Sequence, residues 1–156
     1  MKSRVRELKA MNKNTGFTLI EVLIAMLVLG VGLLGLAGLQ VTSLSSSQSA
    51  YNRSQATELA YDLADRMRAN IAGKATYTTG TAVAKANCLT ITGCSPTEMA
   101  ENDLYQWNSA VAATLPNGAG TVTVAAGTYT IAITWDDNRD GNFDSNDPNF
   151  QTSFQL

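Results

Sequence analysis

The boundary between a short basic segment and a long apolar segment lies at residues 16–21, which read Gly16-Phe17-Thr18-Leu19-Ile20-Glu21. The residues before it carry five Lys or Arg side chains and one acidic side chain, Glu7. Residues 22–39, which follow, carry no charged side chain. A secretory signal peptide is normally cut after its apolar core, so that the core is lost. Here the small residue precedes the core, and cleavage after Gly16 would keep the apolar segment in the mature chain.

Residues 17–39 are long enough to cross a membrane as one helix. These 23 residues would span about 35 Å, against a hydrocarbon core of about 30 Å. Basic side chains precede the segment, and Arg53 is the only one within about fifteen residues after it, so the start of the chain should stay cytoplasmic. The residues after 40 then face the opposite side. A signal anchor that is never cleaved would explain this hydropathy equally well.

Glu21 is the feature that an uncleaved anchor does not explain. A carboxylate inside a membrane helix costs roughly 2.5–3.5 kcal/mol on insertion scales, and less near the helix end, so it should have a partner. Cleavage after Gly16 would create one, because the new α-amino group of Phe17 lies four residues before Glu21. The two groups can meet within one helix or between neighbouring subunits.

This arrangement resembles the class III leader of type IV pilins and of type II secretion pseudopilins. The resemblance implies cleavage after Gly16 by a prepilin peptidase and N-methylation of Phe17. It also implies that Glu21 pairs with the N-terminus of an adjacent subunit during filament assembly. The expected location is the inner membrane, with a periplasmic C-terminal domain, and then the pilus.

Other segments resemble a narrower group, the PilV-type minor pilin or type IV pilus modification protein. The resemblance rests on residues 32–40 (Gly-Leu-Leu-Gly-Leu-Ala-Gly-Leu-Gln), residues 65–70 (Asp-Arg-Met-Arg-Ala-Asn), a cysteine pair and Trp107. It implies a subunit of low abundance that joins other minor pilins and the major pilin and supports pilus assembly near the tip. Two alternatives remain open, a tip adhesin and a pseudopilin of a secretion system.

Composition excludes several other classes of function. The chain has no histidine, so a Ser-His-Asp triad, a Cys-His pair or a typical zinc site cannot form, and we expect no enzyme. From residue 17 onward there are 6 basic and 12 acidic side chains, a net charge of −6. A domain that binds nucleic acid would need a basic surface, so we expect no such partner.

The first helix is predicted to continue beyond the membrane. Residues 17–71 contain no proline, and apolar side chains recur at helical spacing after Tyr51. The stripe consists of Ala56, Leu59, Ala60, Leu63, Ala64, Met67 and Ile71. Gly73 is the expected stop. Residues 42–49 contain five serines and could instead form a flexible linker, but serine breaks helices only weakly and we favour one continuous helix.

Residues 73–94 lose this periodicity and are predicted to form a loop that contains Cys88 and Cys94. Two buried thiols or half of a metal site are alternatives, but the chain has no further Cys or His to complete a site. In an exported domain a disulfide is favoured, and closing so small a ring contributes roughly 2 kcal/mol of stability.

A second helix and a small sheet should complete the domain. Ser95 and Glu98 have capping-box spacing, and Pro96 suits the first turn. The apolar face of this helix consists of Ala100, Leu104, Trp107, Val111 and Leu115, and this stripe favours a core role for Trp107 over a ligand platform. Strands are expected at residues 121–124 and 128–135, joined by a hairpin, and at 150–154.

These elements predict an α+β fold, in which a long N-terminal helix packs under a small antiparallel sheet. The expected divisions are a basic leader (1–16), a transmembrane helix (17–39), its amphipathic continuation (40–72) and a globular domain (73–156).

Residues 136–147 match the pattern of a calcium-binding loop. Oxygen-bearing side chains occupy places one, three, five, nine and twelve, and a glycine stands at place six. The candidate ligands are Asp136, Asn138, Asp140, Asp144, Asp147 and the backbone carbonyl of Asn142. Asp147 replaces the usual Glu and reaches less far. A polar turn rich in Asp, Asn and Gly is the alternative, since any hairpin can use one.

Overall fold

The computed structural model describes residues 16–145 and 147–156. The predicted leader, apart from Gly16, therefore lies outside the described residues. The chain divides into two compact units between Leu44 and Ser45. Its longest element is the helix α1, Leu19–Ala69, which contributes to both units. Residues 42–49 are helical, which confirms the continuous helix and makes the flexible-linker alternative wrong.

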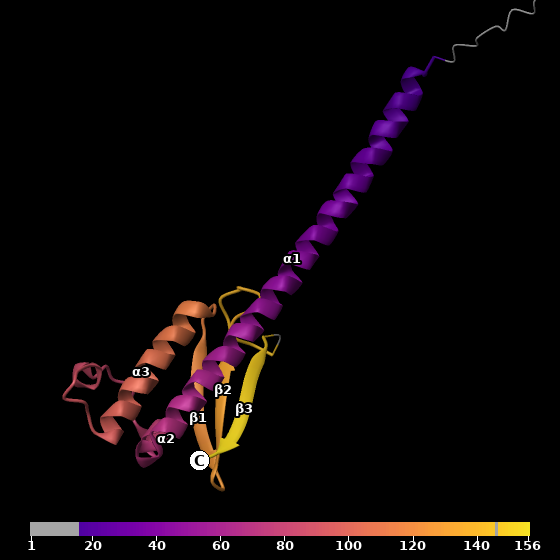
Figure 1. Ribbon diagram of the computed structural model, residues 1–156. Helices are drawn as coiled ribbons and strands as arrows, with labels where there is room; N and C mark the ends of the chain where they lie inside the picture. The colour runs from indigo at the N-terminus through magenta and orange to yellow at the C-terminus, as the bar shows by residue number, and fades with distance from the viewer. Residues whose placement is uncertain (1–15, 146) are drawn as a thin grey trace, which may run out of the picture. The chain divides into compact units, whose positions relative to one another are not determined.

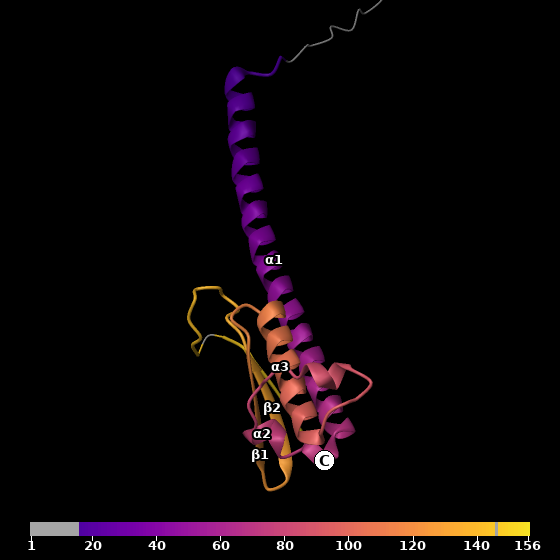
Figure 2. The same cartoon turned by 90° about the vertical axis from the view of Figure 1, so that its left-hand side faces the viewer.

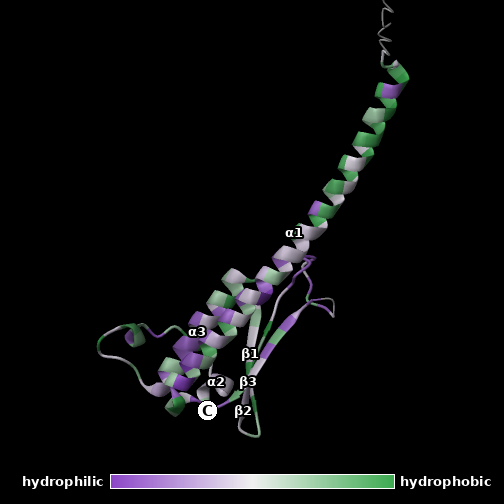
Figure 3. Cartoon of the chain, turned by 45° about the vertical axis from the view of Figure 1, so that its right-hand side comes forward, coloured by the Kyte–Doolittle hydropathy of each residue, from purple (hydrophilic) through white to green (hydrophobic). Residues whose placement is uncertain are grey.

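The first unit contains the apolar half of α1. Apart from Gly30, residues 16–48 are exposed, although most side chains from Leu19 to Leu44 are apolar. Figure 3 shows that hydrophobic residues predominate along the visible face of this half. A Cβ added at Gly30, Gly32, Gly35 or Gly38 would meet no described atom within 4 Å beyond the local helix backbone. Nothing in the packing of the described residues therefore requires these glycines.

The second half of α1 is amphipathic and supplies one side of the core. Its buried residues are Asn52, Ala56, Ala60, Leu63, Ala64 and Met67. Two members of the predicted stripe differ from this pattern, because Leu59 is only partly buried and Ile71 is exposed. Ile71 leaves the stripe because α1 ends at Ala69, four residues before the predicted stop, and the chain turns into the 3-10 helix η1, Ile71–Gly73.

The helix α3, Pro96–Thr114, begins and packs as its sequence predicts. The Ser95 hydroxyl accepts a hydrogen bond from the Glu98 N–H at 3.3 Å, and the Glu98 carboxylate accepts one from the Ser95 N–H at 2.9 Å. All five residues of the predicted apolar face are buried. The indole N–H of Trp107 donates to the Leu59 carbonyl oxygen at 2.9 Å and joins α3 to α1. Trp107 is thus a core residue.

The segment between these helices is more ordered than the predicted loop. It contains η1, the short helix α2 (Thr76–Thr79) and the 3-10 helix η2 (Ala86–Leu89). Tyr77 of α2 is buried in the core. These turns escape a periodicity analysis because each is only three or four residues long and is held by contacts with α3.

The sheet has three antiparallel strands in the order β1-β2-β3. They are β1 (Ala119–Ala125), β2 (Thr128–Thr134) and β3 (Asn149–Gln155), and Val122 pairs with Ile131, which pairs with Thr152. Ala126 and Gly127 form the β1–β2 turn with φ of 48° and 79°. Positive φ at both central residues matches the twist that a two-residue hairpin requires.

Within the second unit, α1 and α3 lie side by side on one face of the sheet (Figures 1 and 2). The core between these two layers joins residues of both helices to Tyr129, Ile131, Ile133 and Trp135. Gly120 of β1 lies directly against the Trp107 ring, and a Cβ there would overlap it. The α+β fold predicted from sequence is therefore confirmed.

Candidate functional site

The N-terminal site is built by the start of α1. The backbone N–H groups of Glu21 and Val22 donate to the Thr18 carbonyl oxygen at 3.0 and 3.3 Å, which begins the helix immediately after Gly16 and Phe17. Glu21 lies in the first turn. A carboxylate there is favoured by the partial positive charge of the helix N-terminus. Sequence-local residues therefore form the whole site.

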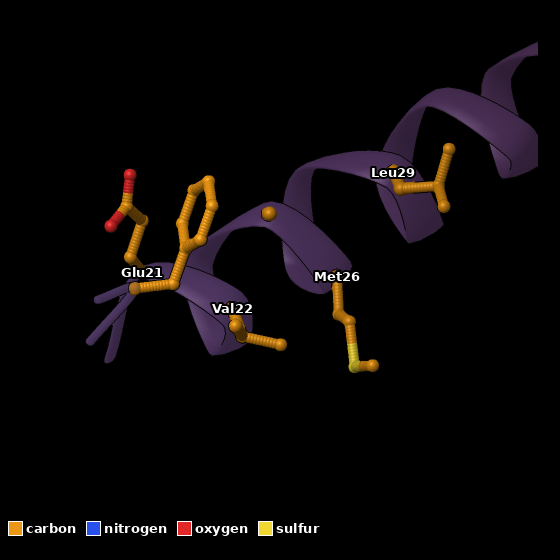
Figure 4. A pocket seen from close by; sticks show the side chains of 6 residues that line it. Glu21, Val22, Met26 and Leu29 are labelled. Carbon is orange, nitrogen blue, oxygen red and sulfur yellow. The ribbon is translucent and has the colours of Figure 1, made fainter. Parts of the chain in front are cut away.

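An apolar hollow extends along the helix from this carboxylate. It is lined by Phe17, Glu21, Val22, Ala25, Met26 and Leu29. Figure 4 shows Glu21 at one end of the hollow, with its carboxylate oxygens directed away from Met26 and Leu29. Within the first unit the lining side chains are exposed. One carboxylate beside an apolar surface can bind a cationic group that arrives with apolar neighbours, but it provides no nucleophile–base pair.

The acidic loop, residues 136–147, is a second candidate site, and it begins at the buried end of β2. Asp136 is 2% exposed. Its Oδ2 accepts hydrogen bonds from the Gly141 N–H at 3.0 Å and from the Asn117 side-chain amide at 3.1 Å. Gly141 adopts a φ of 88°, a conformation that favours glycine. The loop thus folds back over the first of its carboxylates.

Three other candidate ligands, Asn138, Asp140 and Asp147, accept hydrogen bonds from backbone groups of the same loop. Asn138 accepts from the Asp140 N–H at 2.9 Å, and Asp140 accepts from the Asn142 N–H at 2.8 Å. The two oxygens of Asp147 accept from the N–H groups of Asp137 and Asp144, each at 3.0 Å. Across residues 16–145 and 147–156, no three His, Cys, Asp or Glu side chains are grouped closely enough to hold a metal ion.

Asp137 joins the acidic loop to α1, a link that the sequence interpretation missed. Its Oδ1 accepts hydrogen bonds from the Asn52 amide at 3.0 Å and from the Trp135 indole N–H at 2.9 Å. Burial opposes ionisation of this carboxyl, but hydrogen bonds from Asn52, Ser49 and Trp135 and the charge of Arg53 lower the pKa of Asp137 below its ordinary value. The sequence offered one signal for this link. Asn52 lies four residues before Ala56, at a position that continues the apolar stripe, where a polar side chain needs a buried partner.

Cys88 and Cys94 form a disulfide with an S–S distance of 2.04 Å and a Cα–Cα distance of 4.8 Å. The bond closes a short ring between η2 and α3. It leaves no free thiol in the described part of the chain, so its role is structural.

The Asp103 carboxylate is buried and joins α1, α2 and α3. It accepts hydrogen bonds from the Tyr77 hydroxyl at 2.6 Å and from Arg66 Nη1 at 3.3 Å. Burial and the bond to Asp103 raise the pKa of Tyr77 well above its ordinary value. This cluster lies within the second unit and connects three of its helices, so it stabilises the fold of that unit.

Comparison with protein families gives two adjoining matches. A model of the prokaryotic N-terminal methylation motif matches residues 11–37, and a model described as type IV pilin Tt1218 matches residues 38–105. Together they support a type IV pilin. Comparison with curated proteins and with solved structures finds no match.

The pilin matches agree with the geometry of the N-terminal half. In the described part of the chain, α1 alone is long and apolar enough to cross a membrane. The methylation motif includes Gly16, Phe17 and Glu21, and with the apolar helix it indicates a membrane-anchored subunit that associates with other pilins and a prepilin peptidase. Pilins are structural subunits and not enzymes. The pilin model ends within α3, so the sheet and the acidic loop lie beyond the match.

Proposed function

We propose that the chain is a minor pilin of the PilV type, which supports assembly of a type IV pilus. In this proposal a prepilin peptidase cleaves after Gly16, Phe17 is N-methylated, and residues 17–39 hold the subunit in the inner membrane. The domain that follows lies in the periplasm until the subunit joins the pilus. The observation that carries the proposal is the methylation motif that leads directly into an apolar helix with Glu21 in its first turn.

The first half of α1 has the properties that assembly requires. Its apolar side chains are exposed on all sides, so lipid or other subunits must cover them. The four glycines make no close packing contact with their own chain, and glycine permits close approach between membrane helices. A neighbour's N-terminal amine would neutralise Glu21 in this apolar surrounding, which otherwise disfavours a charge.

The proposed subtype rests on the PilV-type resemblance, and residues 65–70, which carry part of it, have a structural role in this domain. Arg66 bonds to Asp103 and to the Gln106 side-chain oxygen, the latter at 2.9 Å. The Asn70 amide donates to the Pro96 carbonyl oxygen at 2.8 Å. The Arg68 guanidinium lies 5.0 Å from the centre of the Phe154 ring. Residues 65–70 therefore hold the end of α1 against α3 and β3. Their identities matter for the stability of the domain.

The test compares Glu21→Ala with Glu58→Gln, which removes one exposed carboxylate from the other half of α1. Both variants should reach the membrane at wild-type levels, because removing a charge does not raise the cost of insertion. Immunoblots of sheared pili should show a large loss of Glu21→Ala and no loss of Glu58→Gln. Equal incorporation of the two variants would contradict the role of Glu21 in assembly.

A deletion strain separates the alternatives. Loss or strong reduction of pili is the result expected for a minor pilin that supports assembly. Normal piliation with loss of surface attachment would indicate a tip adhesin. Normal piliation with blocked protein secretion would indicate a pseudopilin.

A further inference from the structure

The acidic loop contains a buried carboxylate oxygen that nothing in the described structure satisfies. Asp136 Oδ1 is buried and has no hydrogen-bond partner among the described residues. Leaving such an oxygen unpaired costs roughly 1–3 kcal/mol, and more if it is charged. Protonation does not remove the difficulty, because a carboxylic O–H at this position would also need a partner.

The other oxygen of the same carboxylate, Oδ2, has partners both inside and outside the loop. It accepts the N–H of Gly141 at the loop's centre and the side-chain amide of Asn117. The Asp136 N–H donates to the Pro116 carbonyl oxygen at 2.9 Å, which fixes the backbone from which the side chain extends. Asp136 is therefore fixed by Gly141 within the loop and by Asn117 and Pro116 outside it, and one oxygen of its carboxylate is left without a partner among the described residues.

We propose that the loop of residues 136–147 binds a calcium ion through Asp136 Oδ1. This site is independent of the proposed minor-pilin function. The ion would be the positively charged partner that the buried oxygen does not have among the described residues. Further ligands at the required spacing are the side chains of Asn138, Asp140, Asp144 and Asp147 and the Asn142 carbonyl. Calcium accepts six to eight oxygen ligands in a flexible geometry, whereas magnesium requires a near-ideal octahedron.

Binding would require side-chain rotations. The acidic side chains are not grouped within reach of one ion as they stand, and Asp140 and Asp147 now accept backbone N–H groups. Rotation of a carboxylate can leave one oxygen on its N–H group and turn the other towards Asp136. This rearrangement, together with the short Asp147 side chain, predicts weak binding, with a Kd on the order of 10⁻⁴–10⁻³ M, as in extracellular modules.

Calcium binding would also stabilise the attachment of the loop to α1. Asp137 follows the first ligand directly and accepts the hydrogen bond from Asn52. An ion that binds only the folded state stabilises it by an amount that grows with the logarithm of one plus the ratio of the free calcium concentration to Kd. Calcium should therefore raise the melting temperature of the domain as well as occupy the loop.

The experiment uses the full chain in non-ionic detergent with Tb³⁺ as a luminescent probe. Trp135 is buried and lies next to Asp136, so its excitation should sensitise a bound Tb³⁺. We expect saturable emission, displacement by Ca²⁺ in preference to Mg²⁺, and a higher melting temperature with Ca²⁺ than with chelator. Asp140→Asn, which keeps one side-chain oxygen, should weaken binding by about tenfold or more. Glu58→Gln, which removes a carboxylate from α1, should bind like the wild type.

Circular dichroism and cooperative melting verify that each variant is folded, and Asp144→Asn replaces Asp140→Asn if the latter is not. Three results would overturn the proposal: absence of saturable emission, emission that Ca²⁺ does not displace, or equal binding by the folded loop variant and Glu58→Gln. Any of these would identify residues 136–147 as a polar turn whose buried oxygen is satisfied by water.

Discussion

The two halves of α1 belong to one helix but are stabilised in different surroundings. From Leu19 to Leu44 most side chains are apolar, and all residues except Gly30 are exposed within their own unit. From Ser45 to Ala69 a narrow buried stripe packs against α3 and the sheet. Charged residues lie on the exposed side of this half. A helix that is hydrophobic all round needs lipid or other helices to cover it, whereas an amphipathic helix needs its own domain. Only the second half therefore contributes to the core of the chain itself.

The largest expected effect comes from the same substitution placed in each half. Leu63 is 0% exposed and Leu34 is 76% exposed. Leu63→Ala should lower the free energy of unfolding of the domain by about 2–5 kcal/mol, because it leaves a cavity in a packed core. Leu34→Ala should leave it unchanged within about 0.5 kcal/mol. Thermal melting of the full chain in detergent measures both. Equal destabilisation would mean that the first half packs against its own domain.

A second pair compares a buried carboxylate with an exposed one. Asp103→Asn replaces the acceptor of the Tyr77 hydroxyl and removes the charge that faces Arg66. It should destabilise the domain by about 1–3 kcal/mol. Asp65→Asn removes the partner of Arg68 at an exposed position and should cost at most about 1 kcal/mol. Urea unfolding curves compare the two. A larger effect for Asp65→Asn would contradict the assignment of Asp103 as the central acceptor of the cluster.

The smallest effect concerns the link between the acidic loop and α1. Because the pKa of Asp137 is lowered below its ordinary value of 3.8, its contribution to stability is complete above that value and is lost as pH falls through the folded-state pKa. The stability gap between wild type and Asp137→Asn should be present at neutral pH and shrink below about pH 4. Melting in chelator across this range measures the gap. A gap that does not change with pH would contradict the ionised Asp137.

The sequence alone predicted the structural elements that depend on residues close together in the chain. The α3 capping box needs only Ser95 and Glu98, and the alternation of Tyr129, Ile131 and Ile133 gives the buried face of β2 directly. The candidate N-terminal site also involves near neighbours only, since Gly16, Phe17 and Glu21 lie within six residues, and its role in processing and assembly stays a prediction.

The elements that sequence did not predict depend on partners far along the chain. Asn52 is buried because Asp137, 85 residues later, accepts its amide. The turn after α1 is held by Asn70, whose side-chain amide donates to the Pro96 carbonyl oxygen in α3. The spacing of the acidic loop predicts its candidate ligands, but the orientation of Asp136 depends on Asn117, before the first strand.

The first half of α1 can serve as a retained membrane anchor and assembly surface only if the leader is removed in front of it. Intact-mass and peptide mass spectrometry of the protein purified from a strain with prepilin peptidase tests this most directly. We expect a mature chain that begins at Phe17 with one methyl group on its α-amino nitrogen, and unprocessed chain in a strain without the peptidase. A mature N-terminus at Met1, or at any residue beyond Leu39, would contradict the account.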